Sequence, residues 1–162
     1  LERTSFSSPP PFPALDIVEL FMTLRSILQS KGHEVYTTTP ETKLSEVVKK
    51  LVHHQCGSLL VCDGDRLVGI ITERDLLRVS ATDGQDLEST PVSEVMTGNL
   101  VTATPDDSIN QTMGLLTEQR IRHLPILEDD KLVGLISIGD VVKAQYAELT
   151  IENHYLKNYI LS

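Results

Sequence analysis

The sequence contains no tryptophan, and aromatic residues make up only 4% of its 162 residues. An aromatic platform on which single-stranded nucleic acid could stack is therefore not expected. Basic residues are also scarce, because 14 Lys and Arg stand against 23 Asp and Glu, for a formal net charge of −9 at pH 7. Binding of nucleic acid or of an anionic membrane surface needs clustered cations, so the charge argues against both partners. A local binding site for a small anion is still compatible with this negative net charge.

Long apolar runs and a cysteine framework are missing as well. No run of 18 apolar residues occurs, so no membrane-spanning segment is expected. The two cysteines, Cys56 and Cys62, are too few for a disulfide framework, and we interpret them as small buried hydrophobic residues. The alternative is a metal site formed by Cys56 with His53 and His54, but its spacing matches no usual zinc pattern and it lacks a fourth ligand. No metal is therefore expected.

What the sequence does contain is an internal repeat. A displacement of 65 residues aligns Val35–Ala81 with Leu100–Tyr146 without a gap, and eleven of these 47 pairs are identical. Asp75 then falls on Asp140. A repeat this regular predicts two copies of one supersecondary unit that bury their apolar faces against each other. The function is therefore expected in the cleft where the two copies meet.

Each copy predicts the order strand, helix, strand, strand, helix. A short strand ends at a Thr-Pro turn, a helix with one apolar stripe follows, and two apolar strands joined by a polar turn predict a hairpin. The expected elements of the first copy are strand 35–37, helix 44–52, strands 59–62 and 67–71, and a helix from Asp75. Those of the second copy are strand 100–102, helix 109–116, strands 124–127 and 132–136, and a helix from Asp140.

Composition sets the expected boundaries of the units. Residues 1–15 are rich in Ser and Pro and predict a flexible arm. The remaining segments are expected as an N-terminal helix 16–34, a first unit 35–82, a linker 83–91, a second unit 92–148 and a C-terminal helix 149–162. The chain begins without Met. We expect a cytoplasmic protein, with an organelle lumen as the alternative if the N-terminus was processed.

A motif at the end of each predicted hairpin carries the candidate chemistry. It runs over Gly69–Asp75 and again over Gly134–Asp140: Gly, two apolar residues, Thr or Ser, two further residues and Asp. A hydroxyl followed three residues later by Asp predicts a capping box, which does not explain the Gly. The exposed N-terminus of a helix also attracts phosphate, and an adjacent Asp can accept hydrogen bonds from two ribose hydroxyls. From the residues alone, nucleotide binding and pure capping both stay open.

The doubled motif resembles a tandem pair of cystathionine β-synthase (CBS) domains, also called a Bateman module. The resemblance covers about residues 35–81 and 92–148, including Glu94–Thr97 and Ile121–Pro125. It implies an α+β or α/β fold in which two β-α-β-β-α units pack through their sheets about a pseudo-twofold axis. Helices flank the pair at both ends, as in the small stand-alone members of this family.

The resemblance also implies two nucleotide sites in the clefts between the units. The first cleft would be lined by Thr72, Asp75, Val101, Ile121, Arg122 and His123. The second would be lined by Tyr36, Cys56, Gly57, Ser58, Ser137 and Asp140, and Arg74 and Thr37 are further candidate nucleotide-binding residues. The carboxylates would hold ribose hydroxyls, the hydroxyl side chains would touch ribose or phosphate, and apolar strand residues would enclose adenine.

The two copies differ at positions expected beside the clefts. Arg122 of the second copy corresponds to Gly57 of the first, and Arg74 of the first corresponds to Gly139 of the second. A guanidinium is a bidentate donor to phosphate, whereas glycine offers no side chain. Unequal affinities, or different ligands, are therefore expected in the two clefts.

These features predict a regulatory module rather than an enzyme. No Ser–His–Asp order, P-loop or metal-ligand cluster supports catalysis. We expect binding of AMP, ADP, ATP, NAD or S-adenosylmethionine to shift the arrangement of the units and so to signal to an unidentified target protein. The alternative is a ligand-free scaffold. A homodimer is expected in both cases, because helices 44–54 and 109–119 and the terminal helices offer apolar faces.

Overall fold

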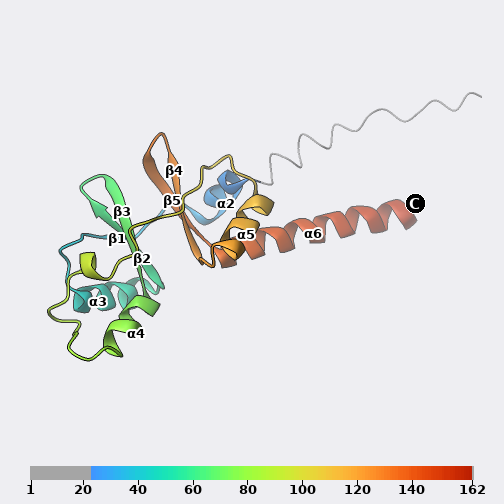
Figure 1. The fold of residues 1–162 in the computed structure, drawn as a ribbon. Helices are drawn as coiled ribbons and strands as arrows, with labels where there is room; N and C mark the ends of the chain where they lie inside the picture. Colours follow the sequence, from blue (N-terminus) through green and yellow to red (C-terminus); the bar gives the residue numbers. More distant parts are fainter. Residues whose placement is uncertain (1–22, 162) are drawn as a thin grey trace, which may run out of the picture.

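The computed structural model describes residues 23–161 (Figure 1). The predicted arm, the first seven residues of the predicted N-terminal helix and Ser162 lie outside the described residues. The elements are α2 (Leu24–Lys31), β1 (Thr37–Thr38), α3 (Leu44–His54), β2 (Ser58–Asp63), β3 (Arg66–Thr72), α4 (Glu73–Ser80), the 3-10 helix η1 (Val92–Glu94), α5 (Ile109–Glu118), β4 (His123–Glu128), β5 (Lys131–Ser137) and α6 (Ile138–Leu161).

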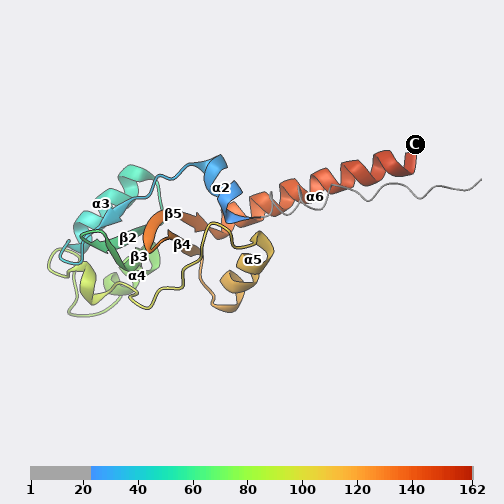
Figure 2. The same cartoon turned by 90° about the horizontal axis from the view of Figure 1, so that it is seen from above.

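Both predicted hairpins are present. β2 pairs antiparallel with β3, and β4 pairs antiparallel with β5. The two hairpins also share a register shift at equivalent positions. It lies between Val61 and Cys62 in the first hairpin and between Ile126 and Leu127 in the second. The two small sheets lie side by side in the middle of the molecule, with α3 and α4 at one end and α5 and α6 at the other (Figures 1 and 2).

The first predicted strand of each copy is where the two units differ. In the first unit a strand forms at Thr37–Thr38, slightly later than predicted, and runs parallel to β2. In the second unit the predicted strand 100–102 is wrong, since only an isolated bridge joins Ala103 to Ile126. The amide of Leu60 donates to the carbonyl of Tyr36, whereas the equivalent residue of β4 is Pro125, which has no amide hydrogen to donate.

Each unit is completed by the segment that precedes the other unit in the sequence. Leu24, Ile27 and Leu28 of α2 are buried in the core of the second unit. In return, Val92 of η1 is buried in the core of the first unit, and Met96 packs against that core. This exchange ties the two units together, because each core includes side chains from the segment before the other unit.

The exchange also explains the glycine of the repeated motif. A Cβ on Gly69 would lie 2.6 Å from the Met96 sulfur and 3.1 Å from the Thr97 carbonyl oxygen. A Cβ on Gly134 would lie 2.5 Å from a methyl group of Leu28. The contacts to Met96 and Leu28 are too short for a carbon atom, so a larger residue would force these side chains to move where the exchanged segment crosses the strand.

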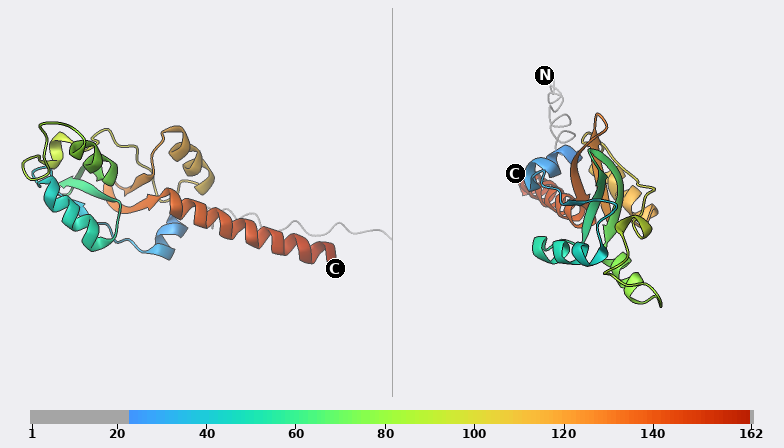
Figure 3. Two further views of the ribbon diagram at one scale, coloured as in Figure 1. Left: turned by 90° about the horizontal axis from the view of Figure 1, so that it is seen from below. Right: turned by 90° about the vertical axis from the view of Figure 1, so that its left-hand side faces the viewer.

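The C-terminal part forms one long helix. The sequence predicts a helix from Asp140 and a separate helix at 149–162, but α6 runs without interruption from Ile138 to Leu161. No Gly or Pro occurs between Val141 and Leu161, so nothing in the sequence breaks the helix. The end of α6 extends well beyond the two units (Figure 3). Across residues 23–161, no helix is both long and apolar enough to cross a membrane.

Candidate nucleotide site

Both copies of the motif form the predicted capping box. One carboxylate oxygen of Asp75 accepts hydrogen bonds from the Thr72 amide at 2.9 Å and from its hydroxyl at 2.7 Å. Asp140 accepts in the same way from Ser137, at 2.8 Å and 2.9 Å. The capping role is therefore real in both copies, and each Asp is fixed at the start of a helix, beside the end of a strand.

A cavity of about 770 Å³ lies between the two units, at the first copy of the motif. It is open to solvent and combines the start of α4 with the end of α5 and the start of β4. All six residues expected in the first cleft line it, and so does the candidate Arg74: Thr72, Arg74, Asp75, Val101, Ile121, Arg122 and His123. Gly57, which the resemblance assigned to the second cleft, lines this cavity as well.

Four of the seven arginines of the chain line this cavity. They are Arg74, Arg78, Arg120 and Arg122, and they face two carboxylates, Glu73 and Asp75. Four cations against two anions make the lining positive in a protein that carries −9 overall. Such a concentration of guanidinium groups attracts phosphate and offers several planar donors to it.

Asp75 is the most enclosed ionic group in this cavity. The residue is 8% exposed, and its second carboxylate oxygen lies 3.9 Å from the Arg78 guanidinium, too far for a strong hydrogen bond. This oxygen is thus placed to accept hydrogen bonds from a ligand while the other one holds the helix. A pair of neighbouring hydroxyls, as on ribose, matches a carboxylate held in this way.

Sequence reasoning missed two of the four arginines. Arg78 lies one turn after Asp75 on α4, and this spacing could have identified it. Arg120 directly precedes Ile121 and has a φ of 53° after the end of α5, as Gln55 has a φ of 52° after α3. This left-handed backbone conformation could not be read from the sequence, because neither Gln55 nor Arg120 is a glycine.

The second copy of the motif is in a different setting. The Lys31 ammonium group donates to an Asp140 oxygen at 2.6 Å and to the Leu135 carbonyl at 2.8 Å. Burial alone would raise the pKa of Asp140, but the hydrogen bonds from Lys31 and Ser137 outweigh it and hold that pKa below its ordinary value. Lys31 was missed because it lies outside the aligned repeat, in the segment that α2 lends to the second unit.

His123 lies close to both copies of the motif. It pairs with Ser137 across the second hairpin and lines the cavity of the first cleft. Burial lowers its pKa most, Asp140 and Glu73 oppose this, and the nearby cations Lys31 and Arg122 lower the pKa further. The ring is therefore neutral at pH 7, and it can both donate and accept a hydrogen bond.

The other residues expected in the second cleft are engaged in the first unit. The Tyr36 ring stacks on His54, with ring centres 3.8 Å apart. Ser58 is buried on β2 opposite Thr72, and Thr37 pairs with Leu60. Asp140 thus contacts Lys31 and its own motif partner Ser137, and none of the three first-unit residues Tyr36, Thr37 and Ser58 is hydrogen-bonded to it.

Cys56 and its histidine neighbours show structural roles. Cys56 packs against the first core, and burial raises the pKa of its thiol. His53 contacts His54 edge to face. Within residues 23–161 no three His, Cys, Asp or Glu side chains lie close enough together to hold a metal ion.

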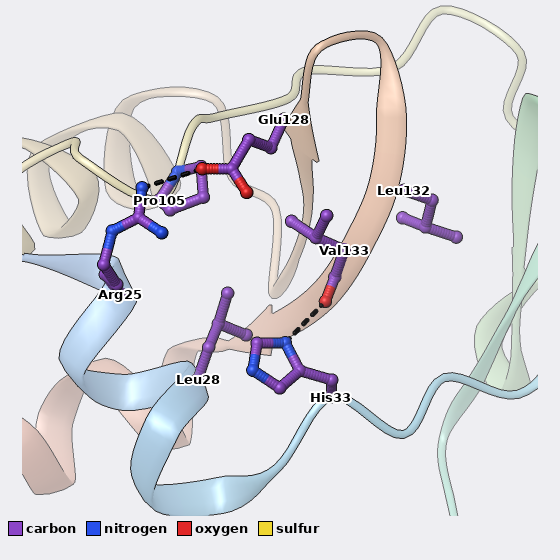
Figure 4. A pocket seen from close by; sticks show the side chains of 7 residues that line it. All are labelled: Arg25, Leu28, His33, Pro105, Glu128, Leu132 and Val133. Atoms are coloured by element: carbon purple, nitrogen blue, oxygen red, sulfur yellow. Dashed lines mark hydrogen bonds and ion pairs between the residues drawn. The ribbon is translucent and has the colours of Figure 1, made fainter.

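A smaller cavity of about 320 Å³ lies between α2 and the second hairpin (Figure 4). Its cation, Arg25, donates to Asp106 at 3.0 Å and to Glu128 at 2.8 Å. The His33 ring lies 3.0 Å from the Val133 carbonyl oxygen. Because its arginine is already paired with two carboxylates, this cavity offers less to an anion than the one at Asp75.

Comparison with known proteins identifies the repeated unit. Residues 24–82 and 92–147 each match the family model of the CBS domain. This chain belongs to the CBS domain family. The match to the first unit begins within α2, whose side chains pack on the second unit.

Several relatives of this CBS pair are known. The mitochondrial CBS domain-containing protein CBSX3 of Arabidopsis thaliana is 37% identical over 148 residues, which cover 85% of this chain and 71% of that protein. A crystal structure of a CBS domain-containing protein from Agrobacterium tumefaciens is 37% identical, with a TM-score of 0.73 over 76% of this chain and 98% of that one. The CBS domain pair of protein MJ0100, crystallised with 5′-methylthioadenosine and S-adenosyl-L-methionine, is 23% identical, with a TM-score of 0.69 over 78% and 97%, and shares the fold.

Proposed function

We propose that this CBS pair is a regulatory module that binds an adenosine nucleotide bearing phosphate in the cavity at Asp75. The observation that carries the proposal is the charge of this cavity: four arginines beside a buried aspartate, in a chain with net charge −9. An acidic protein repels anions in general, so a positive cavity attracts them only locally.

Each part of the nucleotide has matching groups in the cavity. Asp75 is placed to accept hydrogen bonds from the ribose hydroxyls, and Arg120 and Arg122 to bind the phosphates. The apolar side chains of Val101 and Ile121 would enclose adenine. These roles agree with those that the family resemblance implies for the first cleft. ATP, ADP and AMP fit this charge better than S-adenosylmethionine, which carries no phosphate.

The fold neighbour MJ0100 supports the adenosine part of the proposal. Its CBS pair was crystallised with 5′-methylthioadenosine and S-adenosyl-L-methionine, so this fold can accommodate an adenosyl group. The mitochondrial relative CBSX3 favours the organelle alternative over the cytoplasm for this chain.

The position of the cavity supports a signalling role. Its lining comes from both units, and the two units share their core segments, so a ligand that contacts both favours one arrangement over another. The target that reads this arrangement is a further protein. The scaffold alternative needs no ligand and gives no reason for the arginine cluster.

Calorimetric titration tests the proposal. ATP, ADP, AMP, NAD and S-adenosylmethionine are each titrated into the wild-type protein, and ligands released from the purified protein are identified by mass spectrometry. We expect heat from at least one phosphorylated adenosine compound, with about one tight site per chain. No heat from any of the five compounds, together with no released nucleotide, would overturn the proposal in favour of the scaffold.

A further inference from the structure

The last part of α6 carries a row of exposed apolar side chains that no other part of residues 23–161 covers. Tyr146 is 74% exposed, Leu149 56%, Leu156 59% and Ile160 78%. These residues and Asn153 follow one another at intervals of three, four, three and four, and we call them the α6 stripe. This alternation is the seam of a coiled coil rather than the wider face of a helix that packs on its own domain.

The stripe is separate from the face by which α6 packs on its own unit. Val141 is fully buried, and Gln145 donates to Asn110 of α5 at 2.7 Å. Residues 149–161 are all exposed, and Figures 1 and 3 show that this end of α6 leaves the body of the molecule. An apolar stripe on a projecting helix is stable in water only if it meets another surface.

From this seam we propose that two copies of the chain associate through a parallel two-stranded coiled coil formed by Tyr146–Leu161. The proposal is independent of nucleotide binding. Three features of the seam select this partner: the residue types along it, one polar residue within it, and one charge pair beside it.

The residue types fit a parallel dimer. In heptad notation Tyr146, Asn153 and Ile160 occupy position a, and Leu149 and Leu156 occupy position d. Leucine at both d positions, with the β-branched Ile160 at one of the three a positions, favours two strands. The single Asn at a fixes the register and the number of strands. In the monomer the Asn153 amide donates to the Leu149 carbonyl at 2.9 Å, so the side chain already lies along the seam.

The charges fit the parallel direction. Glu152 occupies position g and Lys157 the e position five residues later. In a parallel dimer, g of one helix faces the following e of the other, so Glu152 of each copy meets Lys157 of its twin. In an antiparallel pair, g would face g and e would face e, which brings like charges together.

The packing of α6 on its own unit fixes the first turns of the helix, which an isolated short coiled coil must form unaided. An isolated helix of two heptads is marginal in water, because forming its first turn is costly. Here Val141 and the contacts with α5 already fix the first turns of α6. Dimerisation therefore needs only to dock two preformed helices.

The oligomeric state tests the proposal. Light scattering and sedimentation across micromolar concentrations should give twice the chain mass of 18.0 kDa for the wild type. Leu149→Glu with Leu156→Glu should give the monomer. The matched control is Ile151→Glu with Tyr155→Glu, which alters two exposed residues of the same helix on its other side and should stay dimeric.

The charge pair tests the direction. Lys157→Glu should raise the dissociation constant of the dimer about threefold to tenfold, since exposed pairs are worth little and two are lost. Glu152→Lys combined with Lys157→Glu should restore it. A wild-type monomer throughout the micromolar range, or a dimer unaffected by the two leucine substitutions, would overturn the coiled coil. Failure of the double reversal to restore the dimer would overturn the parallel direction.

Discussion

The two copies of the motif share a capping box and differ in what surrounds it. Asp75 and Asp140 hold their helices by the same hydrogen bonds, to Thr72 and Ser137 respectively. Beyond the box, Asp75 faces a cavity rich in arginine, whereas Asp140 is bound by Lys31 of the same chain. The shared motif thus gives the two places the same backbone conformation, but the charged groups around the two carboxylates differ.

This comparison indicates that the side chains around each motif, and not the motif itself, determine which ligand the cleft can bind. In the first cleft the cations come from α4 and from the segment between α5 and β4, and four of them share one cavity. In the second, a single lysine from α2 reaches the carboxylate directly. Lys31 binds the same Asp140 oxygen that caps the helix, so it adds one cation beside that carboxylate, whereas four arginines line the first cleft. We therefore expect the first cleft to bind a phosphorylated ligand more tightly.

The largest effect is expected from removing the two aspartates one at a time. Asp75→Ala should weaken ATP or AMP about 10- to 100-fold, because it removes charge-assisted hydrogen bonds to ribose. Asp140→Ala should change this affinity little. Both should lose about 1 kcal/mol of stability with the capping box. Calorimetry and thermal melting measure the two effects separately, and equal losses of affinity would contradict the inequality of the clefts.

The motif glycines test the exchanged segments. Gly134→Ala should destabilise the protein by about 1–3 kcal/mol, because the new methyl group meets the fully buried Leu28. Gly69→Ala should cost less than Gly134→Ala, since Met96 is flexible, although the Thr97 carbonyl limits the relief.

Urea denaturation measures both glycine variants. The control is Gly114→Ala in α5, where a Cβ would meet no atom within 4 Å and the change should stabilise the helix by about 0.5–1 kcal/mol. If Gly69→Ala and Gly134→Ala were as harmless as this control, close approach would not be the reason for the glycines.

Arg122 tests the phosphate preference of the first cleft. Arg122→Ala should weaken AMP about fivefold to tenfold while leaving adenosine nearly unchanged, since only AMP carries the anion. The difference should shrink as salt rises, because partly exposed charges are screened. Parallel titrations with AMP and adenosine at two salt concentrations measure it. Equal losses for the two ligands would mean that Arg122 shapes the cleft and does not select phosphate.

The sequence predicted the hairpins and the capping boxes, because the repeat and the motif are local patterns. Residues named from the sequence, such as Asp75 and Arg122, line the larger cavity, but Arg78 and Arg120 were missed. Sequence reasoning misplaced the strand 100–102, since Pro125 removes an amide that Leu60 provides in the other copy. It could not find Lys31, which belongs to a segment exchanged between the units. Contacts of that kind depend on the tertiary arrangement and leave no periodic signal.

The smallest effect is expected at Lys31. Lys31→Met should cost about 0.2–1 kcal/mol at neutral pH, since the ion pair is partly exposed. The pKa of Asp140 is lowered in the folded state, so this stabilisation is present above the unfolded pKa and is lost as pH falls through the folded one. The difference from wild type should therefore shrink in acid, to the part that the hydrogen bond from Lys31 to the Leu135 carbonyl supplies. Lys49→Met on α3 is the control, and a difference that stayed the same from neutral pH to acid would exclude the ion pair as its cause.

A crystal structure of the protein with ATP or AMP tests the central claim most directly. We predict one well-ordered nucleotide in the cavity between the units, with its ribose on Asp75 and its phosphates at Arg120 and Arg122, while Lys31 remains on Asp140. A nucleotide seated at Asp140, with Lys31 displaced and the arginine cavity vacant, would contradict it.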